Sequence, residues 1–340
     1  MAADHREPAS ERVTVWTIEM GEIAARIGRL DREGLRTAAA SAVTWIDLVD
    51  PSTATLRWLE ETCELHPRVV SKTLKPHRTA AITLCDDTTH IVLHYPRLRE
   101  EAHLIRQEVQ VIMRGRLLIT MHEPGAIDVV DVLDHWRDVP ESWRSTTGSL
   151  LYATFRRIIA EFVAATDSLD VALERVHDQV VTREQVTMPR RQMLFALFDV
   201  TEQIADLHEM AEPAVSLMQR LKRNSEWFAD EAGTDHSQDL LDEASLLATR
   251  LGLMGDTAGR LLDSFYALVT LRSTDMSNRL TIVATIFLPL SFLSSYFGQN
   301  FQYLTDQLGS AGQFAAWGVA VPLLSLSVIL VLLQRFGAFN

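Results

Sequence analysis

The segment from Leu280 to Phe297, LTIVATIFLPLSFLSSYF, contains 18 residues and no charged side chain. A second uncharged segment of 20 residues, FAAWGVAVPLLSLSVILVLL, runs from Phe314 to Leu333. A bilayer core of about 30 Å requires about 20 apolar residues in a helix, so each segment is long enough to cross it. The pattern predicts a membrane hairpin: transmembrane helices at 280–297 and 314–333, a connecting loop at 298–313, and a short tail at 334–340.

The charge of the chain lies almost entirely before this hairpin. The sequence has 32 Lys and Arg residues against 45 Asp and Glu residues, for a net charge of −13. After Leu280 the only charged side chains are Asp306 and Arg335, so the water-facing part carries this whole excess. A negative field of this kind repels nucleic acid and attracts cations.

Flanking charges predict the orientation of the hairpin. Arg272 and Arg279 precede the first span and Arg335 follows the second, whereas the loop at 298–313 has no Lys or Arg. The positive-inside rule then places both termini in the cytoplasm and the loop outside. The polar stretch at 1–12 contains no apolar signal-peptide core, and Cys63 and Cys85 form no CxxC pair. Both observations agree with a cytoplasmic location of the residues before the hairpin.

Residues 1–149 alternate between strand-like and helix-like patterns and predict an α/β domain with one sheet. The helix expected at 52–65 follows the start signal Asp50-Pro51-Ser52, and Arg114-Gly115-Arg116 predicts a hairpin turn. Short runs of β-branched and apolar residues mark the expected strands, at 13–18, 43–49, 80–85, 90–95, 108–113 and 117–122.

Residues 150–279 predict a helical stalk. Amphipathic helices are expected from about Phe155 and from Met188, followed by a polar break at 233–237. A third helix is expected from Asp239, continuous into the first span to Phe297, where its 59 residues would extend roughly 90 Å. The alternative is two helices with a joint near Ser273. The third helix carries apolar residues at the alternating spacings of a coiled-coil seam, namely Leu240, Ala244, Leu247, Leu251, Met254, Ala258, Leu261, Phe265 and Leu268.

Several motifs resemble the CorA family of divalent cation transporters. The first span and the Tyr296-Phe-Gly-Gln-Asn-Phe loop are similar to that family's first membrane helix and signature loop. The segments beginning at Trp45, Trp58, Leu65, Glu108 and Leu118 are similar to its cytoplasmic domain, in the same order. The resemblance implies a funnel-shaped homopentamer in a lipid bilayer of the cell membrane, with five first spans lining one pore.

The resemblance also implies a selectivity mouth at Gly298, Gln299 and Asn300. Because Mg²⁺ dehydrates reluctantly, neutral oxygen acceptors there can hold the hydrated ion. The family usually has Met where this chain has Gln299, and a ZntB-type zinc transporter branch also varies this position. Mg²⁺ is therefore the expected substrate, and the alternative is Zn²⁺ or Co²⁺ transport, with proton coupling as an option. The chain also ends without the lysine cluster common in the family.

Residues taken at helical spacing back from Gly298 lie on one face of the first span and the stalk helix. This face is uncharged except for Asp263 at its far end. Leu288 and Leu280 would form apolar rings, and five copies of Asp263 an acidic ring that attracts cations. The alternative is that the small residues only let neighbouring helices approach closely. The expected pore-lining residues are Ser291, Leu288, Ala284, Leu280, Ser277, Thr274, Thr270 and Asp263.

Two further sets of residues are candidate metal ligands. The resemblance implies that acidic residues between subunits bind Mg²⁺ and hold the pore shut. The corresponding candidates are Asp239 and, as its partner from another subunit, Asp86 or Asp87. The alternative is that each of these is a solvated turn or cap residue. His90 and His94 share a strand face, and a packed or exposed histidine pair is favoured over a zinc site.

No HExxH, nucleophile elbow, P-loop or GxGxxG motif occurs, so no enzyme is expected. A function of another class, a non-conducting membrane-anchored coiled-coil sensor or scaffold, is disfavoured because it has no need of the Gly-x-Asn loop.

Overall fold

The computed structural model describes residues 12–19, 21–27, 35, 42–76, 79–98, 104–181, 190–224, 226–297 and 310–335. The chain forms two compact units, which meet in sequence at Leu261 and Leu262. The sheet and the helices before Leu262 thus belong to one unit, whereas the sequence pattern divides them at residue 149.

The first unit contains a seven-stranded sheet with the order β2-β1-β3-β7-β6-β5-β4. The pairing of β3 with β7 is parallel, and the other pairings are antiparallel. All six predicted strands are confirmed, and β2 is an additional strand. The strands are β1 (Arg12–Glu19), β2 (Glu22–Ile27), β3 (Val43–Val49), β4 (Ala81–Cys85), β5 (Thr88–Leu98), β6 (Leu104–Arg114) and β7 (Leu117–His122).

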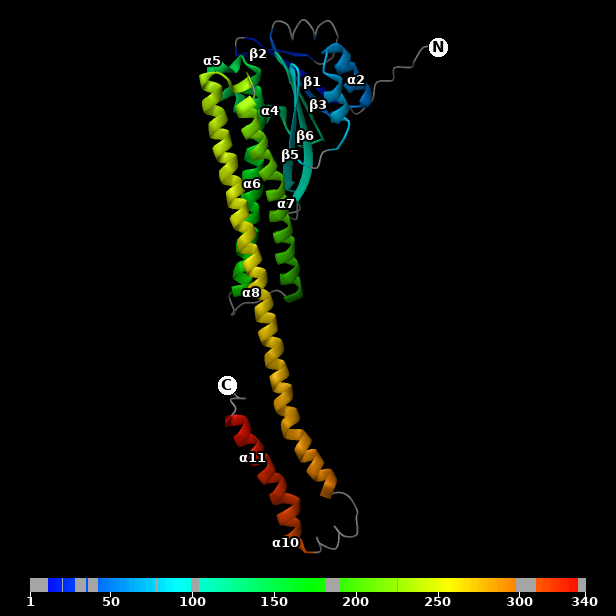
Figure 1. Ribbon diagram of the computed structural model, residues 1–340, viewed down its shortest axis with the longest axis vertical. Coiled ribbons are helices and arrows are strands. Elements are labelled where there is room, and N and C mark those ends of the chain that lie inside the picture. Colours follow the sequence, from blue (N-terminus) through cyan, green and yellow to red (C-terminus); the bar gives the residue numbers. More distant parts are fainter. Residues whose placement is uncertain are drawn as a thin grey trace, which may run out of the picture. The chain divides into compact units, whose positions relative to one another are not determined.

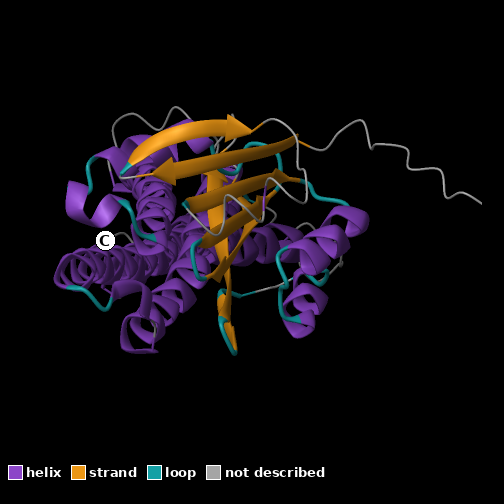
Figure 2. Ribbon diagram, turned by 90° about the horizontal axis from the view of Figure 1, so that it is seen from above, coloured by secondary structure: helices purple, strands orange, loops and turns teal. Residues whose placement is uncertain are grey.

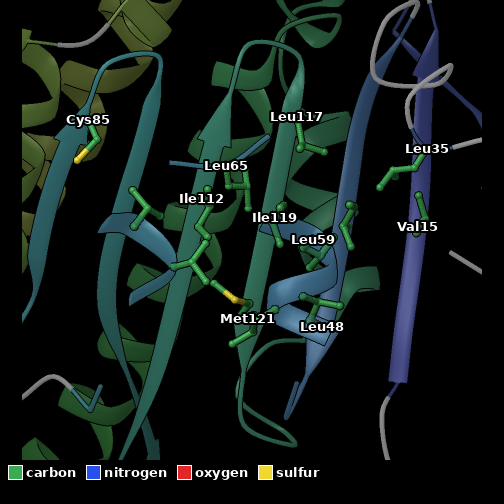
Figure 3. Packing of buried hydrophobic residues seen from close by; sticks show 14 residues of the cluster. Val15, Leu35, Leu48, Leu59, Leu65, Cys85, Ile112, Leu117, Ile119 and Met121 are labelled. Atoms are coloured by element: carbon green, nitrogen blue, oxygen red, sulfur yellow. The ribbon is translucent and has the colours of Figure 1, made fainter. Parts of the chain in front are cut away.

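Helices cover both faces of this sheet, as Figure 2 shows. On one face lie α2 (Thr53–Thr62) and α3 (Pro67–Thr73). Leu59 on α2 and Val69 on α3 join Ile46, Ile119 and Met121 of the strands in one buried cluster, part of which appears in Figure 3. Such burial contributes about 1.5–3 kcal/mol for each large side chain.

The N-terminal ends of α2 and α3 follow ordinary capping chemistry. The Ser52 hydroxyl accepts a hydrogen bond from the Thr55 amide at 3.2 Å, which satisfies one orphan donor of α2. Pro67 occupies the first turn of α3, where its missing N–H costs nothing. The predicted single helix at 52–65 is therefore confirmed as α2, whereas α3 was not predicted.

The other face carries the longer helices. The short helices α4 (Val129–Arg137) and α5 (Glu141–Arg144) lead into α6 (Thr147–Val181) and α7 (Arg190–Asn224). After a 3₁₀ turn, η1 (Glu226–Phe228), the chain enters α8 (Glu231–Phe297). Figure 1 shows α6, α7 and the first part of α8 side by side within the first unit.

The heptad residues of α8 pack inside the same chain. Eight of the nine, from Leu240 to Phe265, are buried, with exposed fractions of 8% or less, whereas Leu268 is 38% exposed. Ion pairs join α8 to α6, because Arg250 contacts Asp167 and Asp170 at 2.7 Å and Arg156 contacts Glu243. The predicted seam therefore lies against neighbouring helices of the subunit itself.

The long helix is continuous but begins earlier than predicted. One helix covers Glu231–Phe297, with Pro289 inside it, so the expected continuity is confirmed and no joint occurs near Ser273. The predicted polar break at 233–237 is wrong, because the Asp230 side chain accepts a hydrogen bond from the Gly233 amide at 2.8 Å and starts the helix there. Asp239 consequently lies within the helix and not at its start.

The second unit contains the end of α8 and a second apolar helical segment. This segment consists of α10 (Ala311–Phe314), the π-helical turn η2 (Ala315–Ala320) and α11 (Val321–Arg335). By length and composition, α8 and the segment at 311–335 can each cross a membrane. Both predicted spans are therefore helical.

Candidate functional site

The predicted selectivity mouth lies outside the described residues. The structure describes α8 as far as Phe297, and Gly298, Gln299 and Asn300 follow it in the sequence. Their role remains a prediction from the sequence.

The predicted pore-lining residues all lie on α8. Leu280 and Leu288 are 71% and 69% exposed in the single chain, so two large apolar side chains face outward without packing against their own subunit. Asp263, Thr270, Thr274, Ser277 and Ser291 are likewise exposed, and Ala284 is half-buried. Exposed leucines in a helix that can cross a bilayer fit contact with lipid or with neighbouring subunits.

The threonine hydroxyls of this helix donate hydrogen bonds to backbone carbonyls of the same helix. Thr270 donates to the carbonyl of Tyr266 at 2.9 Å, and Thr274 donates to the carbonyl of Thr270 at 3.0 Å. Thr281 and Thr285 likewise donate to the carbonyls four residues earlier, those of Ser277 and Thr281. Because the single hydroxyl proton is used in this bond, the oxygen presents only lone pairs to the outside. Such oxygens can accept hydrogen bonds from the water shell of a cation.

Asp86 and Asp87 occupy the turn between β4 and β5, as predicted. The Asp87 carboxylate accepts a hydrogen bond from Arg114 at 2.6 Å, and this bond lowers the pKa of Asp87. Asp86 adopts a positive φ of 48° and lies 3.6 Å from His66. Asp87 is therefore already neutralised by a cation of its own chain, which any metal ion there would have to displace.

Asp239 lies elsewhere on the first unit. Its side chain is exposed on α8, and its charge adds to burial in raising the pKa of Tyr152 on α6. Within the described residues, no three His, Cys, Asp or Glu side chains gather closely enough to hold a metal ion. The three predicted regulatory residues thus do not form a metal site within one subunit.

His90 and His94 are packed in the sheet. Their exposed fractions are 1% and 4%, and the Nε2 atom of His90 lies 2.8 Å from Oε1 of Gln110. Of the two alternatives left open by the sequence, a packed or an exposed pair, the structure shows the packed one.

A buried charged pair was missed from the sequence. Asp47 on β3 and His122 on β7 lie 3.2 Å apart, with side chains 5% and 1% exposed. Asp47 also accepts a hydrogen bond from Thr120 at 2.5 Å, and Thr120 accepts one from the Trp45 indole at 3.0 Å. The only sequence signal was a polar residue within each of two apolar strands.

This pair favours a protonated imidazole. The Nδ1 atom of His122 lies 2.8 Å from the carbonyl oxygen of Glu123, so acceptors face both ring nitrogens. Burial alone would lower the pKa of His122, but the hydrogen bond and negative charge of Asp47 outweigh it and the pKa is raised. The pair binds β3 to β7 across the parallel pairing.

Comparison with known proteins extends over nearly the whole of this architecture. The model of the CorA-like Mg²⁺ transporter protein family matches residues 40–335, which include strands β3 to β7 of the sheet, the long helix and both apolar segments. The chain belongs to the CorA family. The family is one of membrane transporters of divalent cations and not an enzyme class.

Individual relatives are distant in sequence. The cobalt/magnesium transport protein CorA of Thermotoga maritima is 22% identical over 298 residues, covering 86% of this chain and 82% of the relative. The CorA magnesium transporter of Methanocaldococcus jannaschii has the same fold, with a TM-score of 0.73, 16% identity, and coverage of 95% of this chain and 97% of the other. The ZntB cytoplasmic domain of Vibrio parahaemolyticus matches with a TM-score of 0.57 and 11% identity, over 76% of this chain and 97% of the other.

Proposed function

We propose that five copies of this chain form a pore that passes hydrated Mg²⁺ down its electrochemical gradient. The observation that carries the proposal is the exposed part of α8, where Thr270 and Thr274 on the predicted face present acceptor oxygens and Leu280 and Leu288 do not pack against their own subunit. Five such helices around an axis would surround the ion with lone pairs. The water shell of Mg²⁺ donates hydrogen bonds and is costly to remove, so it fits such a surface.

The leucines and the acidic residue would give this pathway a gate and an entrance. Apolar rings formed by Leu280 and Leu288 can close a pore by dewetting, and a ring of Asp263 carboxylates concentrates cations at its cytoplasmic end. The membrane potential supplies about 2.3 kcal/mol for each elementary charge per 100 mV. No step of this mechanism requires ATP or a catalytic residue.

Transport of Zn²⁺ or Co²⁺, with proton coupling as an option, is the second candidate. It is favoured by Gln299 at the position where the family usually has Met, and by the similarity of fold to the ZntB cytoplasmic domain. An additional amide beside the ion path can change which hydrated ion is held best.

A regulatory Mg²⁺ between subunits is a further part of the proposal. It would use Asp239 of one subunit with Asp86 or Asp87 of the next. Asp86 lies beside His66, and Asp87 would first have to leave Arg114. Its affinity should therefore be modest compared with that of a site built only from free carboxylates.

The orientation follows from the flanking arginines, with both termini in the cytoplasm and the loop at 298–313 outside. A cysteine introduced at Ser310 should react with a membrane-impermeant maleimide in intact cells. One introduced at Asp235 should react only after the cells are opened. The reverse labelling pattern would contradict this orientation.

The experiment that tests the function is ion flux into proteoliposomes. Mg²⁺, Zn²⁺, Co²⁺ and Ni²⁺ should be compared for the wild-type chain and for Asn300→Ala. Uptake of at least one ion, strongly reduced by the substitution, supports the pore. If the purified chain carries none of them, the non-conducting scaffold becomes the better account.

A further inference from the structure

The exposed surface of α8 in the first unit is one narrow stripe. From Asp235 to Arg260, every exposed residue of α8 falls on positions that are spaced alternately by four and three residues, and the residues between them are buried or half-buried. Asp263, the first predicted pore-lining residue, follows Arg260 at the next step of the same spacing. This outer stripe consists of Asp235, Asp239, Asp242, Leu246, Thr249, Leu253, Asp256 and Arg260.

Two leucines interrupt this polar stripe. Leu246 is 71% exposed and Leu253 is 62% exposed, which makes them the two most exposed large apolar side chains among the described residues of the first unit. They lie one heptad apart with Thr249 between them, so the middle of the stripe is uncharged. Single exposed apolar residues are ordinary, but leucines repeated at heptad spacing on an exposed stripe are the pattern of a contact between helices.

The partner of these leucines must lie in water. Asp242 precedes Leu246 by one helical turn, and Asp256 follows Leu253 by one turn. Carboxylates are costly within a bilayer, so lipid is a poor partner for this part of α8.

A second copy of α8 is complementary to the middle of the stripe. When identical parallel helices pack around an axis, each heptad position contributes one layer of identical side chains. Leu246 and Leu253 would then form two apolar layers, with a layer of the smaller Thr249 side chains between them. Such layers remove apolar surface from water without placing a charge in the contact.

The charges of the stripe limit where this contact can form. Asp235, Asp239 and Asp242 precede the leucines, and no basic residue of the stripe lies among them. Layers of these carboxylates would repel one another between copies, so the helices should diverge toward the start of α8. Asp256 and Arg260 follow the leucines and have opposite charges, so a layer of one sign lies beside a layer of the other and the contact can continue there.

We infer that a second copy of this chain covers Leu246, Thr249 and Leu253 with the same three residues of its own α8. The inference rests on the proposed assembly of five copies, and it assigns a point in the stalk where neighbouring copies touch. The helix then has two packing seams, because its heptad residues contact their own subunit and its outer stripe contacts the next copy.

Disulfide cross-linking of the full-length protein in native membranes tests the inference, with one cysteine introduced at a time. Oxidation of Leu246→Cys or of Leu253→Cys should give a covalent dimer as the main product, because neighbouring copies would place the two sulfur atoms within reach of each other. Little dimer should form in the wild-type chain, which contains Cys63 and Cys85, or in Asp206→Cys, an exposed position on α7.

A second substitution tests whether the leucines hold the copies together. Leu246→Asp added to Leu253→Cys should reduce the yield of dimer about tenfold, because the contact loses the burial of a leucine and gains like charges. Since Leu246 is mostly exposed in the single chain, this change should leave the fold of the subunit intact. The control is Phe195→Asp added to Leu253→Cys, which replaces a 59% exposed apolar side chain on α7 and should leave the yield unchanged.

Light scattering of the wild-type protein in detergent separates this inference from the proposed pore. A monomer would contradict both. An oligomer in which neither Leu246→Cys nor Leu253→Cys gives more dimer than Asp206→Cys would overturn the inference alone. Cross-linking of the introduced cysteines to a different protein would also overturn it, in favour of a partner of another kind.

Discussion

Replacing Asp47 by Asn should destabilise the first unit by about 3 kcal/mol at pH 5.5. Removing one partner of a buried ion pair costs about 3–5 kcal/mol, because the other charge is left without compensation. The lower figure applies here because Asn keeps a carbonyl oxygen that can accept from Thr120 and His122. With about 2–4 °C for each kcal/mol in a domain of 150–250 residues, the melting temperature should fall by about 6–12 °C.

The cost should depend on pH in a defined direction. The pKa of His122 is raised in the folded chain above the value of about 6.5 expected when unfolded. The pair therefore contributes its full stability below about pH 6.5, and this contribution is lost as the pH rises through the folded pKa. Above the folded pKa the imidazole is neutral in both wild type and variant, so the difference between them should shrink as the pH rises through that pKa.

Intrinsic fluorescence of the purified full-length chain during heating is a suitable assay, because the Trp45 indole donates to Thr120 within the same network. The control is Asp134→Asn, which removes an exposed ion pair with Arg137 whose side chains are 63% and 58% exposed. Exposed pairs of this kind contribute about 0.2–1 kcal/mol. The reasoning is refuted if Asp47→Asn costs no more than the control at pH 5.5, or if its cost does not decrease at any point as the pH is raised from 5.5.

Two further predictions concern the ion pathway. Thr270→Val and Thr274→Val should each lower cation flux several-fold by removing an acceptor oxygen, whereas Thr→Ser at the same positions should retain it. Thr285→Val is the control, because Thr285 makes the same backward hydrogen bond but lies off the predicted face; equal effects at all three positions would argue against that face. Gln299→Met should change the ratio of Mg²⁺ to Zn²⁺ and Co²⁺ carried in a competition assay, and an unchanged ratio would show that Gln299 does not select the ion.

The sequence predicted those elements whose signal is local. The strand at Val43–Val49 and the apolar spans stand out because their composition and length differ from their surroundings. The continuity of α8 was predictable because no Gly or Pro interrupts the region around Ser273. The residues from Gly233 to Ser237 were misread because their polar composition resembles a loop, and the cap from Asp230 acts through a hydrogen bond that composition does not reveal.

Pairings between distant segments could not be predicted. The pair Asp47 and His122 depends on the parallel register that places Val49 opposite His122, and 75 residues separate the two side chains. The same holds for Arg114, which reaches Asp87 across 27 residues and changes the chemistry available to that carboxylate. The heptad seam illustrates a different limit, since periodicity showed that one face of α8 is buried but not that α6 supplies part of the covering surface.

Divalent cation flux through the reconstituted wild-type chain, compared with Asn300→Ala, tests the central proposal most directly. The proposal predicts Mg²⁺ uptake that increases with an inside-negative membrane potential and falls strongly in the variant. Uptake that is the same in Asn300→Ala would contradict the proposed mouth, and the absence of any divalent cation uptake by the wild-type chain would contradict the pore itself.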